Sequence, residues 1–283
     1  MLSKFLANPV VGLPKHSSES HQVNEILAAA ELIATARRDR TPLAPLPAPL
    51  APQHGAGGYR IQAAVHERLA REQGPLAGYK IGCTSPVMQQ YLGIPHPCGG
   101  GVFASGVYTS GIALEHGDYV RVGVECEIAV RLGRDLNAGL APFTAETVVQ
   151  AIDAYHPAIE IVDDRYVRWE TLGAPTLIAD DFFAAGCVLG DAVPRSSAPE
   201  LADVVGHAIL NDGEAATGTG ADVLGHPHNA LAWLANHLAA QGTQLRAGEI
   251  VLTGSLVKTL WLDVGDAVTM NLSGLGSVSV RFV

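Results

Sequence analysis

The strongest constraint on the fold is an unbroken period-two alternation of apolar residues between positions 119 and 132. Seven positions, each two apart, carry the apolar residues Val120, Val122, Val124, Cys126, Ile128, Val130 and Leu132. Successive side chains of a β-strand point to opposite faces of the sheet, so these seven share one face. The segment is therefore predicted to be a long strand with one face in the core.

Shorter patterns predict the other elements. Apolar spacing and capping residues predict helices over about 24–38, 59–73, 86–92, 144–155 and 227–241. Strands are predicted at 157–162, 250–253, 260–262, 268–272 and 277–282, the last four as a β-meander. Asn211-Asp212-Gly213 indicates a hairpin turn, and Gly99-Gly100-Gly101 is interpreted as a loop. Many strands with few helices, and no regular βαβ alternation, favour an α+β fold.

The chain is expected to divide into three parts. Residues 1–20 are predicted to be a loose N-terminal extension, and 21–75 a helical segment. That segment contains a proline-rich connector at 41–52, which is unsuited to a β-ladder. Residues 76–283 are predicted to form the catalytic domain. A chain of 283 residues can bury a full-sized core.

Composition argues against several classes of partner. The net charge is −10, and the only basic cluster is Arg37, Arg38 and Arg40, so a nucleic-acid partner is not expected. No stretch has the roughly 20 apolar residues that span a bilayer, and Pro9 interrupts the short apolar N-terminus, so neither a membrane span nor a signal peptide is expected. The four cysteines lack zinc-type spacing, which favours reduced thiols and a cytoplasmic location.

Two acidic residues interrupt the predicted long strand. Glu125 and Glu127 are two apart, so both project from the face opposite the apolar stripe. A hard cation such as Mg²⁺, Mn²⁺ or Ca²⁺ would relieve the repulsion between their carboxylates. This spacing alone is nevertheless more often that of two ordinary surface glutamates. Glu160 strengthens the metal interpretation, because it lies in an apolar run where an unpaired charge is costly.

Other residues leave alternatives open. Glu170 or Asp164 could supply the third ligand, although both have polar neighbours. Lys80, between glycines, could bind a substrate carboxylate or could equally be a surface lysine. Signatures of serine hydrolases, P-loop and dinucleotide-binding proteins, and zinc proteases are missing from the sequence.

Five short motifs in order resemble the 2-keto-4-pentenoate hydratase branch of the fumarylacetoacetate hydrolase superfamily. The similarity covers about residues 75–283. The motifs are Gly78-Tyr-Lys-Ile-Gly-Cys-Thr-Ser-Pro, Val124-Glu-Cys-Glu-Ile-Ala, Pro157-Ala-Ile-Glu-Ile-Val, Leu224-Gly-His-Pro-His-Asn-Ala and Gly248-Glu-Ile-Val-Leu-Thr-Gly. The resemblance, which also extends to 4-oxalocrotonate decarboxylases, implies a β-rich mixed sheet or roll around a carboxylate-held Mg²⁺ or Mn²⁺. It also implies a homo-oligomer.

The resemblance assigns roles to individual residues. It implies that Glu125, Glu127 and Glu160 bind the metal and that Lys80 lines the active site. Thr253 and Gly254 match a turn beside the substrate. The sequence departs from the branch on the substrate side, where Ser105 replaces a typical Asp, and Asp180-Asp181 replaces a typical Asp-Asn pair. Asp180 is the candidate proton-shuttling group.

We therefore expect a metal-dependent hydratase (lyase) that adds water to a 2-hydroxy-2,4-dienoate to give a 4-hydroxy-2-oxo acid. A decarboxylase of a 2-oxo diacid would use the same polarised 2-oxo group. An acylpyruvate-type C–C hydrolase would need a base, for which His54 and the pair His66-Glu67 are candidates. A catalytically silent binding homologue is the alternative of another class, motivated by Ser105 and Asp181.

Overall fold

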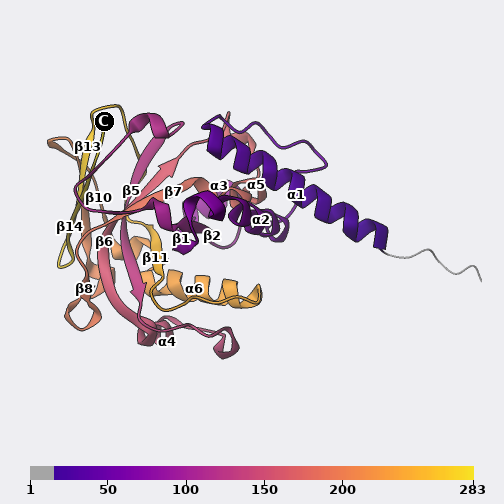
Figure 1. The fold of residues 1–283 in the computed structure, drawn as a ribbon. Helices are drawn as coiled ribbons and strands as arrows, with labels where there is room; N and C mark the ends of the chain where they lie inside the picture. The colour runs from indigo at the N-terminus through magenta and orange to yellow at the C-terminus, as the bar shows by residue number, and fades with distance from the viewer. Residues whose placement is uncertain (1–15) are drawn as a thin grey trace, which may run out of the picture.

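The computed structural model describes residues 16–283, which form two mixed β-sheets with helices gathered beside them (Figure 1). The helices are α1 (His16–Asp39), α2 (Gly55–Gln73), α3 (Pro86–Leu92), α4 (Ala145–Val148), α5 (Ala174–Ala179) and α6 (Pro227–Ala240). In Figure 1, α1, α2, α3 and α5 lie together at one side of the molecule, and α4 and α6 lie at another. The predicted α+β class is confirmed.

The larger sheet has nine strands and carries the long strand that the sequence predicts. Its main path runs β2-β1-β11-β5-β6-β7-β3, while β12 pairs with β5 and β8 with β6. The bounds are β1 (Leu76–Gly82), β2 (Cys98–Phe103), β3 (Val107–Thr109), β5 (Val122–Leu132), β6 (Ile152–Asp163), β7 (Ala184–Leu189), β8 (Val193–Pro194), β11 (Ile250–Ser255) and β12 (Leu260–Trp261). The β1–β11 and β3–β7 pairs are parallel.

The smaller sheet has five strands in the order β10-β9-β13-β14-β4. The bounds are β4 (Ile112–Leu114), β9 (Val205–Leu210), β10 (Gly213–Thr219), β13 (Ala267–Leu272) and β14 (Gly276–Phe282). Asn211, with φ of 54°, lies in the turn between β9 and β10, so the predicted hairpin is confirmed. The predicted C-terminal strands also exist, but a simple meander is wrong. Strands β11 and β12 belong to the larger sheet, and of these four C-terminal strands only β13 and β14 pair with each other as a hairpin.

The antiparallel pair of β5 and β6 is the centre of the larger sheet. Every member of the predicted stripe from Val122 to Leu132 is buried in the main core, which confirms the strand, although Val120 lies before it. Strand β6 is longer than predicted, and the helix predicted over 144–155 is wrong beyond Ala151. Ile152 pairs with Leu132 of β5, so long-range pairing overrides the local helical pattern.

The glycines at 99–101, interpreted from the sequence as a loop, are instead buried residues of β2. The N-terminal helices also differ from expectation, because α1 begins at His16, inside the segment predicted to be loose. Residues 1–15 lie outside the described part. Helices α1 and α2 share a second hydrophobic cluster with α5, which includes Ile33, Leu69 and Ile178. No helix within residues 16–283 is long and apolar enough to cross a membrane.

Candidate metal centre

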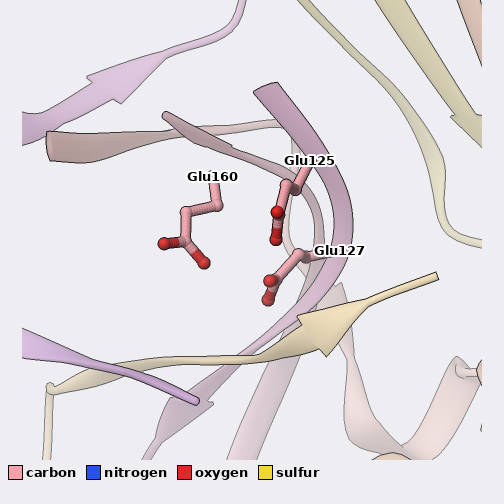
Figure 2. A group of neighbouring side chains, drawn as sticks. All are labelled: Glu125, Glu127 and Glu160. Carbon is pink, nitrogen blue, oxygen red and sulfur yellow. The ribbon is translucent and has the colours of Figure 1, made fainter. Parts of the chain in front are cut away.

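Three carboxylates meet on one face of the β5–β6 pair. Glu125 and Glu127 project from β5, and Glu160 of β6 is the direct cross-strand partner of Glu125. One oxygen from each carboxylate lies within 4.8 Å of the other two. Figure 2 shows the three side chains converging on one small region. Glu127 and Glu160 are 0% and 1% exposed, so the interpretation as an ordinary surface glutamate is wrong for Glu127.

The hydrogen bonds around the cluster orient its carboxylates and leave some of their oxygens without a partner. The backbone N–H of Gly254 donates to Glu127 Oε2 at 2.9 Å, and the Thr259 hydroxyl donates to Glu125 Oε1. Within residues 20–283, Glu127 Oε1 and Glu160 Oε2 are buried and accept no hydrogen bond. A buried carboxylate oxygen without a donor is costly, so these two atoms are suited to receive a cation.

The electrostatics of the cluster favour the same conclusion. Burial, together with the charges of Glu160 and Glu125, raises the pKa of Glu127 well above its ordinary value. Burial raises the pKa of Glu160 to about 7; Lys80 opposes this rise and Glu125 adds to it. Three carboxylates therefore face one ammonium group. Oxygen ligands of this kind fit a hard divalent cation such as Mg²⁺, Mn²⁺ or Ca²⁺.

Lys80 lies beside the three glutamates, on β1. Its Nζ is 2.9 Å from Glu160 Oε1 and donates to the carbonyl of Phe182 at 3.2 Å, and the residue is 3% exposed. Burial disfavours the charged ammonium, but Glu160 and Glu125 raise the pKa of Lys80 above its ordinary value. The interpretation of Lys80 as a surface lysine is therefore wrong.

Asp180 and Asp181 form a buried ionic network next to Phe182. The guanidinium of Arg37 reaches both carboxylates, with Nε 2.6 Å from Asp180 Oδ1 and Nη2 3.0 Å from Asp181 Oδ2. Arg165 pairs with the other oxygen of Asp180, and His66 Nε2 lies 2.7 Å from Asp181 Oδ1. Asp180 and Asp181 are 1% and 0% exposed, so both charges are compensated within the protein.

This network holds an unusual backbone segment. Asp181, Phe182 and Phe183 form a short turn, and all three have left-handed φ values of 56°, 53° and 69°. For residues other than glycine this conformation costs about 1–2 kcal/mol each. The glycines of β2 make room for the turn and for His66. A Cβ on Gly100 would lie 2.7 Å from the carbonyl oxygen of Asp181, and one on Gly101 would lie 2.8 Å from the His66 ring.

The remaining predicted residues lie at different distances from the cluster. The amide of Gly254 contacts Glu127, while the buried hydroxyl of Thr253 donates to the carbonyl of Ile128 at 2.8 Å. Ser105 is exposed, in a turn after β2 (Ala104–Gly106). Lys80 of β1 pairs with Gly100 of β2, and Ser105 lies five residues after Gly100 in the sequence. Its role in substrate binding stays a prediction.

The candidate bases of a hydrolase form no hydrogen bond with the carboxylate cluster in the described part of the chain. His54 precedes the first residue of α2, and Glu67 is exposed. His66 is engaged with Asp181. Among the side chains from residue 20 onward, none of these three hydrogen-bonds to Glu125, Glu127 or Glu160. Sequence reasoning missed Arg37, Arg165 and the positioning contact of His66; the run of three glycines was the one local signal of a close approach at this place.

The chain is similar to known proteins over nearly its whole length. It is 35% identical to a 2-keto-4-pentenoate hydratase of Paraburkholderia phymatum over 260 residues, which cover 92% of this chain and 98% of that protein. A 2-hydroxyhexa-2,4-dienoate hydratase of Comamonas testosteroni is 34% identical over 72% of this chain and 77% of its own length.

A solved structure has the same fold. The 4-oxalocrotonate decarboxylase of Pseudomonas putida G7, complexed with magnesium and adipate, superimposes with a TM-score of 0.87. Its sequence identity is 27%, and the match covers 92% of this chain and 98% of that one. The family described as fumarylacetoacetate (FAA) hydrolase C-terminal matches residues 102–283. With the family matched over more than half of its length, and with relatives that align along almost all of it, the chain belongs to the fumarylacetoacetate hydrolase family.

Proposed function

We propose that this chain is a divalent-metal-dependent hydratase that adds water to a 2-hydroxy-2,4-dienoate and releases a 4-hydroxy-2-oxo acid. The observation that carries the proposal is the buried cluster of Glu125, Glu127 and Glu160 with Lys80, in a chain 35% identical to a protein named as a hydratase. Mg²⁺ and Mn²⁺ suit the all-oxygen donor set, and the decarboxylase structure similar to this chain holds magnesium.

The three glutamates would hold the metal. Gly254 and Thr259 already fix one oxygen each of Glu127 and Glu125, so these carboxylates are oriented before a cation binds. When bound, the metal supplies a Lewis acid and a template for the 2-oxo acid end of the substrate. Glu127 Oε1 and Glu160 Oε2 are buried and have neither a hydrogen-bond donor nor an ion-pair partner in the described chain.

Lys80 would bind the carboxylate end of the substrate. Its ammonium is buried and points at the same region as the glutamates, where a charge-assisted hydrogen bond is strongest. Conversion of the dienol transfers the proton of the 2-hydroxyl group to C5, which leaves a 2-oxo group and a double bond between C3 and C4. The hydroxyl of one water then adds to C4, and the remaining proton of that water adds to C3. Asp180 stays the predicted proton-shuttling group, although its contacts with Arg37 and Arg165 support a positioning role.

A decarboxylase of a 2-oxo diacid is the second candidate, because of the close match in fold to 4-oxalocrotonate decarboxylase. A diacid would need a cation for its second carboxylate. In the described chain, Lys80 is the cation paired with the glutamate cluster, whereas Arg37 and Arg165 are bound to Asp180 and Asp181. This arrangement favours a substrate with one carboxylate.

The four cysteines are free and buried, which supports a reducing, cytoplasmic location.

The test is a substrate panel. The Mg²⁺-loaded protein is incubated with 2-hydroxydienoates, 2-oxo diacids and acylpyruvates, and ultraviolet absorbance, CO₂ release and products are measured. We expect loss of dienoate absorbance with formation of a 4-hydroxy-2-oxo acid, and no activity after treatment with EDTA. CO₂ release from a diacid at the higher catalytic efficiency would replace the hydratase by the decarboxylase. Activity that survives complete metal removal would contradict the metal requirement.

A further inference from the structure

The ammonium of Lys80 has two protein partners, and they come from different parts of the fold. Glu160 belongs to the carboxylate cluster, whereas the carbonyl of Phe182 belongs to the left-handed turn. That carbonyl reaches Lys80 only because Asp181, Phe182 and Phe183 adopt φ values that L-residues rarely adopt. Such a segment persists only if the surrounding contacts hold it, so the position of Lys80 depends on what fixes the turn.

Arg37 of α1 contacts both acidic residues at the start of this turn, whereas Arg165 donates to the carbonyls of Asp180 and Ala184 on either side of it. Arg37 donates to both carboxylates, and its Nη2 also donates to the carbonyl oxygen of Asp180 at 2.9 Å. One planar guanidinium therefore spans two consecutive residues, an arrangement that lysine cannot reproduce. The Arg37 side chain is 9% exposed and lies 143 residues from Asp180 along the sequence. It also lies before residues 102–283, the segment that the family description matches.

We infer that Arg37 is a positioning residue of the active site. Through Asp180 and Asp181 it keeps the Phe182 carbonyl in hydrogen-bonding distance of Lys80. The ammonium group is thereby held next to Glu160, where it faces the substrate. This inference rests on the proposed function, in which Lys80 binds the substrate carboxylate. The N-terminal helix α1 would then contribute to catalysis without touching the substrate, and its last turn would be part of the site.

A double-mutant cycle tests the inference. The variants are Arg37→Met, Lys80→Met and the double variant, each assayed for kcat and KM with the substrate that the panel identifies. If Arg37 acts through Lys80, Arg37→Met lowers kcat/KM about tenfold or more, and the double variant is no worse than Lys80→Met alone. Losses that multiply would mean that Arg37 acts independently of Lys80, and they would overturn the inference.

Arg38→Met is the matched control. Arg38 is the next residue of α1, but it forms ion pairs with Glu31 and Glu72 at the surface. The same substitution there should leave kcat/KM within twofold of wild type. An equal loss in Arg38→Met would trace the effect to α1 as a whole and count against a specific role of Arg37. Mg²⁺ affinity, measured by calorimetry, should stay within about threefold in Arg37→Met, because the glutamates themselves are untouched.

A crystal structure of Arg37→Met gives a readout that does not depend on the reaction. We expect the turn to relax and the Phe182 carbonyl to leave Lys80. A structure that keeps this hydrogen bond at about its present 3.2 Å would overturn the inference even if the hydratase proposal stands. Conversely, a relaxed turn in the crystal of Arg37→Met could coincide with a wild-type protein that has no hydratase activity. That pair of results would support the positioning role and reject the proposed reaction. If Arg37→Met does not fold, Arg37→Lys takes its place. Lysine keeps the positive charge but lacks the two donor nitrogens of the guanidinium, so this variant should show the same coupling to Lys80 with a smaller loss of kcat/KM.

Discussion

Glu127 is the most deeply buried carboxylate of the cluster, and its charge is the least compensated. Its neighbours in space are two further carboxylates, and the ammonium of Lys80 is closest to Glu160. Burial of such a charge is unfavourable unless a proton or a cation neutralises it. The residues that bind a metal in the proposed enzyme are therefore the residues that destabilise the metal-free protein.

Substitution Glu127→Gln separates these two effects. The amide oxygen can still accept the hydrogen bond from Gly254, while one negative charge is lost. We expect Mg²⁺ affinity to fall at least about tenfold, since affinity follows ligand charge. In EDTA the unfolding midpoint should equal or exceed that of wild type. Calorimetry and thermal unfolding measure the two quantities, and the exposed Glu146→Gln is the control. Unchanged Mg²⁺ affinity would remove Glu127 from the ligand set.

Substitution Lys80→Met should affect both activity and stability. Loss of a charge-assisted contact with the substrate should lower kcat/KM about ten- to hundredfold. Without Lys80, Glu160 also loses its buried ion-pair partner. The free energy of unfolding should fall by about 3 kcal/mol, and by less if Glu160 takes up a proton. The loss in stability should appear in EDTA and shrink when Mg²⁺ is added. Lys258→Met, at an exposed lysine, should leave the unfolding midpoint unchanged. Kinetics within twofold of wild type would exclude Lys80 from the site.

The three members of the carboxylate cluster could be picked out from the sequence because their signals are local. Glu125 and Glu127 interrupt a period-two stripe, and Glu160 interrupts an apolar run. Their convergence depends on the register of β5 and β6, which places Glu160 opposite Glu125 and which no local pattern encodes. The partners of Asp181 were not predictable, because Arg37 and His66 come from helices more than a hundred residues away in the sequence.

At the scale of elements, two predictions from local sequence patterns were wrong. In one case strand pairing determined the structure, and in the other the close packing of a neighbouring segment did. Residues 152–155 have a helical pattern, yet they extend β6 because β5 offers a continuous ladder. The three glycines of β2 resemble a loop, yet they form a strand against which the Asp181 turn packs. Side chains at Gly100 or Gly101 would collide with the turn or with His66. The absence of side chains there is thus a packing requirement of the neighbouring segment.

The turn at Asp181 should make stability depend on pH in acid. Burial opposes ionisation of Asp181, but the charges of His66 and Arg37 and the N–H of Gly101 hold its pKa below its ordinary value. An aspartate in the unfolded chain has a pKa of about 3.9. Below this pH the unfolded state binds a proton that the folded state does not, so stability falls as the pH decreases.

The comparison of wild type with Asp181→Asn measures this contribution. We expect the free energy of unfolding, from urea titrations between about pH 2.5 and 6, to fall more steeply below pH 4 in wild type than in the variant. At pH 6 the variant should be the less stable of the two, since Arg37 and His66 lose a charged partner. Parallel curves for the two proteins would mean that Asp181 does not contribute through its charge.

At the scale of the whole molecule, the N-terminal helices and the catalytic sheet form one structural unit around the site. The second hydrophobic cluster joins α1 and α2 to α5 and reaches Phe182, while Arg37 and His66 hold the preceding residue. All three glutamates nevertheless come from two neighbouring strands of one chain. Each chain can therefore assemble its own carboxylate cluster, and assembly of subunits is not required to complete that cluster.

The oligomeric state is the last prediction. We expect a symmetric homo-oligomer, as the resemblance to the hydratase branch implies, with one Mg²⁺ bound per chain. Large apolar side chains are exposed on several elements, including Val87 at 75% and Tyr91 at 59% on α3, and a partner surface would cover such groups. Light scattering at micromolar concentration should give a multiple of the 29.5 kDa chain mass. Calorimetry on the same sample should give one site per chain, because the glutamates lie within one subunit. A stable mass near 29.5 kDa would contradict assembly, whereas one metal per two chains would mean that the cluster is shared.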